Sequence, residues 1–181
     1  LNSFGVLMPK IYKQKYKDLI IGYDKKYKLS ILSFNTGCVM LFKRETFLKV
    51  GSFDENYFLY FEETDFFTRC INKGKNIYLY DKFIIKHDGS RSINLKYKNE
   101  YMIFRNWHYC WSKFYYYRKH KNYFIALSKT FPNFKKSIFG MIKSLILSNP
   151  LQFKLRNAEF MGLTRSYLTM KSAHRMNIDI D

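Results

Sequence analysis

Two adjacent carboxylates, Glu62 and Glu63, are the side chains best suited to chemistry in this chain. They begin the segment 62–73, in which acidic residues come first and basic residues last. This order of charges is typical of a helix. The positive end of a helix favours an ionised carboxylate, whereas two neighbouring like charges disfavour it. A carboxylate under both influences can act as a general base toward a hydroxyl group. The alternative is that these acids only match the helix dipole and cap the helix.

A histidine, His87, is the second candidate, because it directly follows a predicted strand over residues 83–86. Loops that leave strand ends carry the chemistry of many α/β enzymes. A neutral imidazole there could complete a metal site built from carboxylate and phosphate oxygens, and a packing role is the alternative. Asp65 and Arg69 are four residues apart and can pair along one helix face, for roughly a few tenths of a kcal/mol.

Short strands and helices are predicted around these residues, in an α/β fold. A buried strand over Phe4 to Lys10 is expected to be ended by its proline, and a polar, lysine-rich link follows. Two helices are each closed by a glycine, Gly51 or Gly74, where a left-handed residue follows the last turn. The predicted helices cover 43–50 and 62–73, and the predicted strands cover 29–34, 38–42, 76–80 and 83–86, with a turn at 81–82.

The chain after Leu95 becomes aromatic, basic and helical. Apolar residues at helical spacing predict a helix over 101–120, and a second helix is expected from Pro132 to Ser148, where Asn149 and Pro150 stop it. Residues 101–178 contain one acidic residue and fourteen lysines and arginines. Such helices can lie on an anionic membrane surface or pack as a cap on the folded core, and both interpretations remain open.

The net charge of +18 in 181 residues indicates an anionic partner: nucleic acid, membrane or phosphorylated substrate. Coding bias toward Lys, Asn, Ile, Phe and Tyr would also produce it. No recognised nucleic-acid motif accompanies the charge, so no nucleic-acid partner is expected. Three scattered cysteines favour reduced thiols. No uninterrupted apolar run reaches the length of about 18 residues expected of a spanning helix.

An ordered series of motifs between Thr36 and Ser92 resembles the family 2 glycosyltransferases, especially the bacterial rhamnosyltransferase-like group. The series begins with a small-residue turn and apolar strand over 36–41 and a basic helix start at 43–45. The strings VGSFDE at 50–55 and YFEETD at 60–65 follow. It ends with Gly74 and a strand ending in His87, with Gly89 and Ser92 behind it. The resemblance implies the acceptor-side, C-terminal half of a GT-A fold over residues 1–96 and a basic amphipathic helical extension over residues 97–181.

The resemblance implies an inverting enzyme that moves a sugar, rhamnose by analogy, from a nucleotide-sugar donor to a hydroxyl. The acceptor would be a cell-surface glycan or a polyprenyl-linked glycan, at the cytoplasmic face of the membrane. Glu63 would be the general base, where the family more often has aspartate, and His87 would bind the divalent metal, Mg or Mn, on the donor pyrophosphate. Residues implied in substrate binding are Gly37, Asp54, Glu62, Asp65 and Ser92.

The donor-binding half of that family would precede Leu1, and no Asp-x-Asp metal motif occurs before Glu62. We therefore expect the 181-residue chain to be inactive by itself. Two alternatives remain, a non-catalytic glycan-binding remnant of the same fold and a basic nucleic-acid-binding module.

Overall fold

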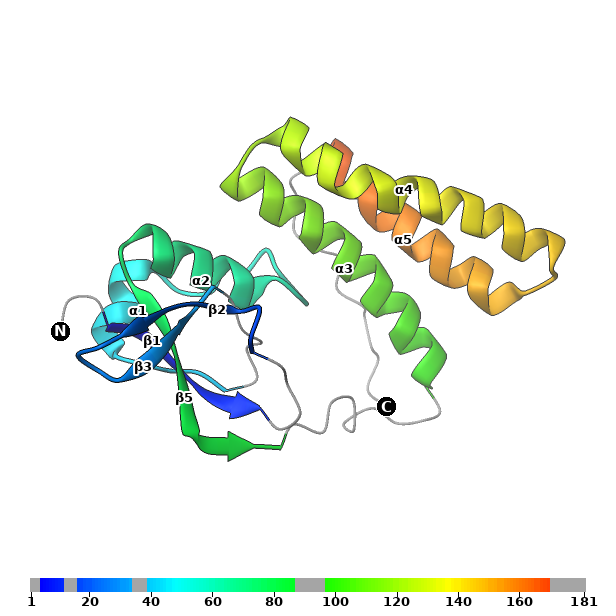
Figure 1. The fold of residues 1–181 in the computed structure, drawn as a ribbon. Helices are drawn as coiled ribbons and strands as arrows, with labels where there is room; N and C mark the ends of the chain where they lie inside the picture. The colour runs from blue at the N-terminus through cyan, green and yellow to red at the C-terminus, as the bar shows by residue number, and fades with distance from the viewer. Residues whose placement is uncertain (1–3, 12–15, 34–38, 87–96, 170–181) are drawn as a thin grey trace, which may run out of the picture. The chain divides into compact units, whose positions relative to one another are not determined.

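The chain folds into two compact units, with Glu55–Phe61 and Arg91–Asp181 in the second and the remainder in the first (Figure 1). The computed structural model describes residues 4–11, 16–33, 39–86 and 97–169. In this part of the chain the fold is mixed α/β, with one five-stranded sheet and five helices, which agrees with the predicted α/β class at that level. None of the described helices is both long and apolar enough to cross a bilayer.

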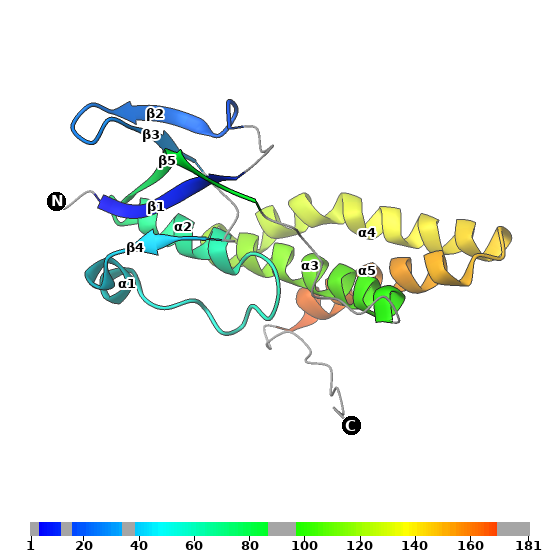
Figure 2. The ribbon, with the colours of Figure 1, turned by 90° about the horizontal axis from the view of Figure 1, so that it is seen from below.

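The first unit is built on a mixed sheet with strand order β2-β3-β5-β1-β4 (Figure 2). Strands β1 and β5 are parallel, and the other neighbouring pairs are antiparallel. The strands are β1 Phe4–Ile11, β2 Ile20–Asp24, β3 Leu29–Leu32, β4 Leu41–Phe42 and β5 Asn76–Ile85. Two helices accompany them, α1 Arg44–Val50 and α2 Glu62–Asn72.

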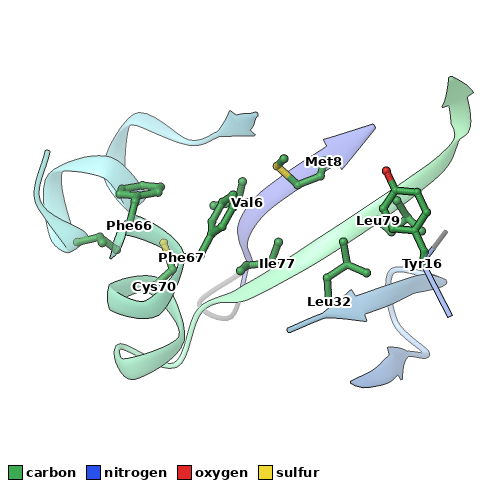
Figure 3. Close-up of a cluster of buried hydrophobic side chains, with 10 residues drawn as sticks. Val6, Met8, Tyr16, Leu32, Phe66, Phe67, Cys70, Ile77 and Leu79 are labelled. Atoms are coloured by element: carbon green, nitrogen blue, oxygen red, sulfur yellow. The ribbon is translucent and has the colours of Figure 1, made fainter. Parts of the chain in front are cut away.

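The core of the first unit lies where α2 packs against the sheet (Figure 3). Phe66, Phe67 and Cys70 recur at helical spacing, and each is at most 1% exposed. Figure 3 shows Phe67 directed toward Val6 of β1. Full burial of one such Phe side chain contributes about 1.5–3 kcal/mol, so this face holds α2 on the sheet. The strands add further buried residues, Met8, Leu32, Ile77 and Leu79.

Strand β2 corrects the prediction of a polar link after β1. It forms an antiparallel hairpin with β3, and the turn is closed because Asp24 Oδ1 accepts from the N–H groups of Lys26 and Tyr27 at 2.9 and 3.1 Å. The Tyr78 hydroxyl of β5 also donates to Asp24 Oδ2 at 2.7 Å. The strand lies at an edge of the sheet with largely exposed side chains, so no alternating apolar pattern marks it in the sequence.

Strand β5 corrects a second prediction, because it is one strand and not two. The expected turn at 81–82 is a bulge: Pro9 of β1 pairs with Tyr80, while the next residue, Lys10, pairs with Ile84. Pro9 does not end β1 either. Proline lacks the N–H that a regular ladder needs, and an irregular register at that point tolerates its absence.

The second unit contains three long helices, α3 Lys98–His120, α4 Tyr123–Ile146 and α5 Pro150–Leu168. Figures 1 and 2 show α4 and α5 lying side by side in opposite directions. Helix α4 begins nine residues before Pro132, contrary to the prediction, because Asn122 caps it by accepting from the Ile125 N–H at 2.8 Å. Helix α5 was not predicted.

The Asn149–Pro150 pair is predicted to end the preceding helix, and in the structure it also begins α5. Asn149 Oδ1 accepts from the Gln152 N–H at 3.0 Å, and Pro150 occupies the first turn, where its missing N–H costs nothing. Helix α5 approaches α3 closely at Gly162, where an added Cβ would lie 2.4 Å from the Trp107 carbonyl oxygen.

Two of the three cysteines lie among the described residues, and both are free and buried, as predicted. Burial raises the pKa of the Cys70 thiol to about 11 and that of Cys110 to about 12. These thiols are therefore poor nucleophiles at neutral pH.

Candidate functional site

The strongest candidate site lies at the start of α2, where Glu62 and Glu63 occupy the first turn as predicted. The two preceding residues, Tyr60 and Phe61, have left-handed backbone angles, with φ of 67° and 70°. Each such residue costs about 1–3 kcal/mol when it is not glycine, and strained backbone of this kind clusters at functional sites. The entry into α2 is therefore a defined, strained bend that the sequence did not reveal.

The carboxyl of Glu63 has a pKa above its ordinary value of 4.5. Partial burial is the main cause, because it disfavours the charged form, and the negative charge of neighbouring Glu62 adds to it. The backbone N–H groups of Glu63 and Thr64 donate to the carboxylate and partly oppose the rise. A carboxylate with a raised pKa holds a proton more strongly, so Glu63 is a better general base at neutral pH than an exposed glutamate.

The neighbouring carboxylate of Glu62 has a different environment. Its Oε2 atom is buried and finds no hydrogen-bond partner among the described residues. A buried acceptor without a donor is costly, and in native proteins such groups commonly have a functional reason. The charge of Glu62 also raises the pKa of the Glu63 carboxyl, and the assignment of Glu62 to substrate binding stays a prediction.

The predicted Asp65–Arg69 pair forms, and its carboxylate is buried. Asp65 is completely buried, and its Oδ2 accepts from Arg69 Nε at 2.8 Å. The Arg69 guanidinium also donates to the carbonyl oxygens of Val50, Gly51 and Ser52, at 3.0, 3.0 and 2.8 Å. The pair thus joins α2 to the end of α1. The assignment of Asp65 to substrate binding stays a prediction, and its carboxylate is already engaged by Arg69.

Of the other residues predicted to belong to the site, the structure describes Asp54 and not Gly37, His87 or Ser92. Asp54 is half-buried in the first unit. Within the described ranges, no group of three or more His, Cys, Asp or Glu side chains could hold a metal ion. Glu62 and Glu63 by themselves supply too few ligands for a divalent metal site.

The aromatic segment Glu55–Phe61 belongs to the second unit, which the sequence did not indicate. The Ser112 hydroxyl of α3 donates to the Leu59 carbonyl oxygen at 2.9 Å, and the ring of Tyr57 lies 5.0 Å from that of Tyr115. A signal was present, because both the segment and α3 are rich in Phe and Tyr. Aromatic content predicts burial but not the partner.

A cavity of about 490 Å³ lies between α3 and α5 in the second unit. Aromatic residues of α3, Phe104 and Trp107, form part of its wall, and Glu100, Lys154 and Asn157 bring polar groups to it. This volume is within the range of small-molecule sites. No residue predicted from the sequence to bind substrate or metal lines this cavity.

Comparison with known proteins bears on the region that contains the two glutamates. Residues 17–92 match the family model described as the N-terminal domain of galactosyltransferase, which covers less than half of the chain. No curated protein and no solved structure matches the chain. The predicted glycosyltransferase character is confirmed at this level, and the match implies in general a nucleotide-sugar donor and a glycan acceptor. Residues 17–92 are therefore similar to a glycosyltransferase domain, and α2 with both glutamates lies inside the matched region.

Proposed function

We propose that this chain contributes the acceptor-activating part of an inverting glycosyltransferase, with Glu63 as the general base. The observation that carries the proposal is the raised pKa of the half-buried Glu63 carboxylate at the start of α2, within the glycosyltransferase-type domain. An inverting transfer needs one carboxylate to remove the proton of the acceptor hydroxyl as it attacks the sugar.

Glu63 is the proton acceptor in the proposed reaction. The hydroxyl proton moves to a carboxylate oxygen of Glu63, while the hydroxyl oxygen forms a bond to the anomeric carbon from the face opposite the nucleotide. The bond between that carbon and the leaving phosphate oxygen breaks, and the nucleotide diphosphate keeps the electron pair. Glu62 supports this step through its negative charge, which raises the pKa of the Glu63 carboxyl.

The finer features of the proposal rest on the resemblance to the family 2 enzymes. They are the GT-A fold, a rhamnose-type donor sugar, a polyprenyl-linked acceptor at the cytoplasmic membrane face, and Mg or Mn bound through His87. The metal would supply charge neutralisation of the donor pyrophosphate. Gly37, Asp54 and Ser92 would contact substrate. A glycan-binding remnant without catalysis remains the second candidate, because aspartate is more usual in that family where this chain has Glu63.

The test is the Glu63→Gln variant of the protein, produced with its natural flanking sequence. Transfer of label from a panel of nucleotide sugars to glycan acceptors should fall by about 10²–10⁴ in kcat, the range of general-base catalysis. Glu63→Asp should retain part of the activity. Glu45→Gln is the matched control, because Glu45 is likewise an acid in the first turn of a helix and is exposed.

Activity that survives Glu63→Gln would eliminate the general-base assignment. Glycan binding by the wild-type protein, together with no transfer from any donor of the panel, would favour the non-catalytic remnant instead.

A further inference from the structure

Helix α4 exposes several large apolar side chains, although Phe134 packs against Phe160 and Tyr167 of α5. The residues that it buries are small: Ala126, Thr130 and Ser137 are completely buried, and Ser144 is 7% exposed. The three hydroxyls donate to carbonyl oxygens of α4 itself, so this narrow face packs with its polar groups satisfied. A soluble amphipathic helix normally turns its large apolar residues inward.

The opposite face of α4 presents the large apolar residues to solvent. Phe124 is 80% exposed, Phe139 is 69% and Ile146 is 77%, with Phe131 and Ile142 at 46% and 50%. Their spacing places all five on one stripe, because residues 7, 11 and 18 apart return to nearly the same side of a helix. The stripe runs along most of a 24-residue helix. Single exposed apolar residues are ordinary, but a continuous stripe marks a docking surface.

A row of lysines accompanies this stripe. Lys129, Lys136 and Lys143 follow each other at intervals of seven residues and form an exposed line beside it. Lys135 lies within the stripe, with its Nζ atom 5.4 Å from the centre of the Phe131 ring. Helix α4 contains no Asp or Glu. The partner of this surface must therefore be apolar and anionic at once, and it must extend over the length of a helix.

We propose that the exposed face of α4 docks on an anionic lipid bilayer. The helix axis lies in the plane of the membrane interface, the five apolar side chains enter the boundary between headgroups and acyl chains, and the lysine row binds headgroup phosphates. Self-association through the same face would bring its lysines together, which like-charge repulsion disfavours. This proposal does not depend on sugar transfer, because it rests on the second unit alone.

Vesicle flotation of the full chain tests the proposal without any sugar substrate. The protein should float with vesicles of phosphatidylcholine and phosphatidylglycerol at low salt, and it should remain at the bottom with phosphatidylcholine alone. Added salt should release it, because exposed charges are screened. No flotation with the anionic vesicles would overturn the proposal.

The apolar contribution is tested by Phe139→Ser combined with Ile146→Ser. Membrane partitioning should fall on the order of a hundredfold, because burying one large apolar side chain contributes about tenfold or more. The matched control is Leu48→Ser combined with Phe83→Ser in the first unit, where exposure is similar, at 67% and 61%. The control pair should partition as the wild type does. An equal loss in both pairs, or no loss in either, would refute docking through α4.

The charged contribution is tested by Lys136→Gln combined with Lys143→Gln. Each lysine at an anionic surface contributes about fivefold to partitioning, so the pair should cost on the order of 25-fold and reduce the salt dependence. Lys25→Gln combined with Lys82→Gln removes two exposed lysines of the first unit and should change little. Circular dichroism establishes that every variant is folded.

A tryptophan placed at the surface distinguishes a membrane from a protein partner. Emission of Phe139→Trp should shift to the blue when anionic vesicles are added, whereas that of Phe83→Trp should not. A blue shift of Phe139→Trp with rising protein concentration, in the absence of lipid, would show that a second copy covers the face. That result would overturn the membrane assignment.

Discussion

Replacing Asp65 with asparagine should destabilise the first unit far more than the few tenths of a kcal/mol expected of an ordinary pair on one helix face. The side chain is completely buried, and its carboxylate holds Arg69, whose own side chain is 17% exposed. Arg69 in turn donates three hydrogen bonds to the carbonyl oxygens at the end of α1. Asparagine preserves the shape of aspartate and removes only the charge, so the guanidinium is left with a neutral partner in a largely buried setting.

Removing one partner of a buried ion pair costs about 3–5 kcal/mol, and the partial exposure of Arg69 favours the lower end, about 3 kcal/mol. Urea unfolding of Asp65→Asn, Arg69→Gln and the double variant measures both the loss and the coupling energy, which should be at least about 1.5 kcal/mol. Asp81→Asn, at an exposed position, should change the unfolding free energy by less than about 0.5 kcal/mol. A loss below about 1 kcal/mol for Asp65→Asn, with no coupling, would refute the view that this pair joins α1 to α2.

Two further predictions concern Glu63 and the helix contact at Gly162. Because the pKa of Glu63 is raised in the folded protein, the native state binds its proton more tightly than the unfolded state, so the unfolding free energy should fall as pH rises from 4.5 through the raised pKa. Glu63→Gln should remove this pH dependence and stabilise the protein at neutral pH. Urea unfolding at mildly acidic and mildly alkaline pH measures both effects. If the unfolding free energy of the variant changes with pH as that of the wild type does, the raised pKa of Glu63 is contradicted. Gly162→Ala should lower the unfolding free energy by about 1–3 kcal/mol, because the new methyl group meets the rigid Trp107 carbonyl at 2.4 Å. Gly140→Ala is the control: its methyl group meets only the movable Arg156 side chain, so this variant should be neutral or stabilising in thermal or urea unfolding. Equal effects of the two alanines would argue against close packing of α5 on α3.

Local signals in the sequence were sufficient for several elements that surround the site. Both predicted helix ends at Gly51 and Gly74 are present, with φ of 94° and 68°. The charge order from Glu62 to Arg69 predicted α2 and placed the two glutamates in its first turn. These predictions succeed because a helix start, a helix end and a left-handed glycine each depend on a few adjacent residues. The glycosyltransferase character of this region also followed from the order of motifs, and the family match supports it.

Tertiary structure decided the features that give those residues their chemistry. The sequence placed Glu63 at a helix start beside Glu62, but the main cause of its raised pKa is burial, which only the fold supplies. It spaced Asp65 and Arg69 for a pair along one helix face, but only the fold buries the carboxylate and extends the arginine to α1. It made α4 apolar and basic, but only packing against its neighbours buried a row of small residues and left five large apolar side chains exposed. Burial and long-range contacts depend on residues far apart in the chain, so nearest-neighbour patterns carry no information about which face is covered or what covers it.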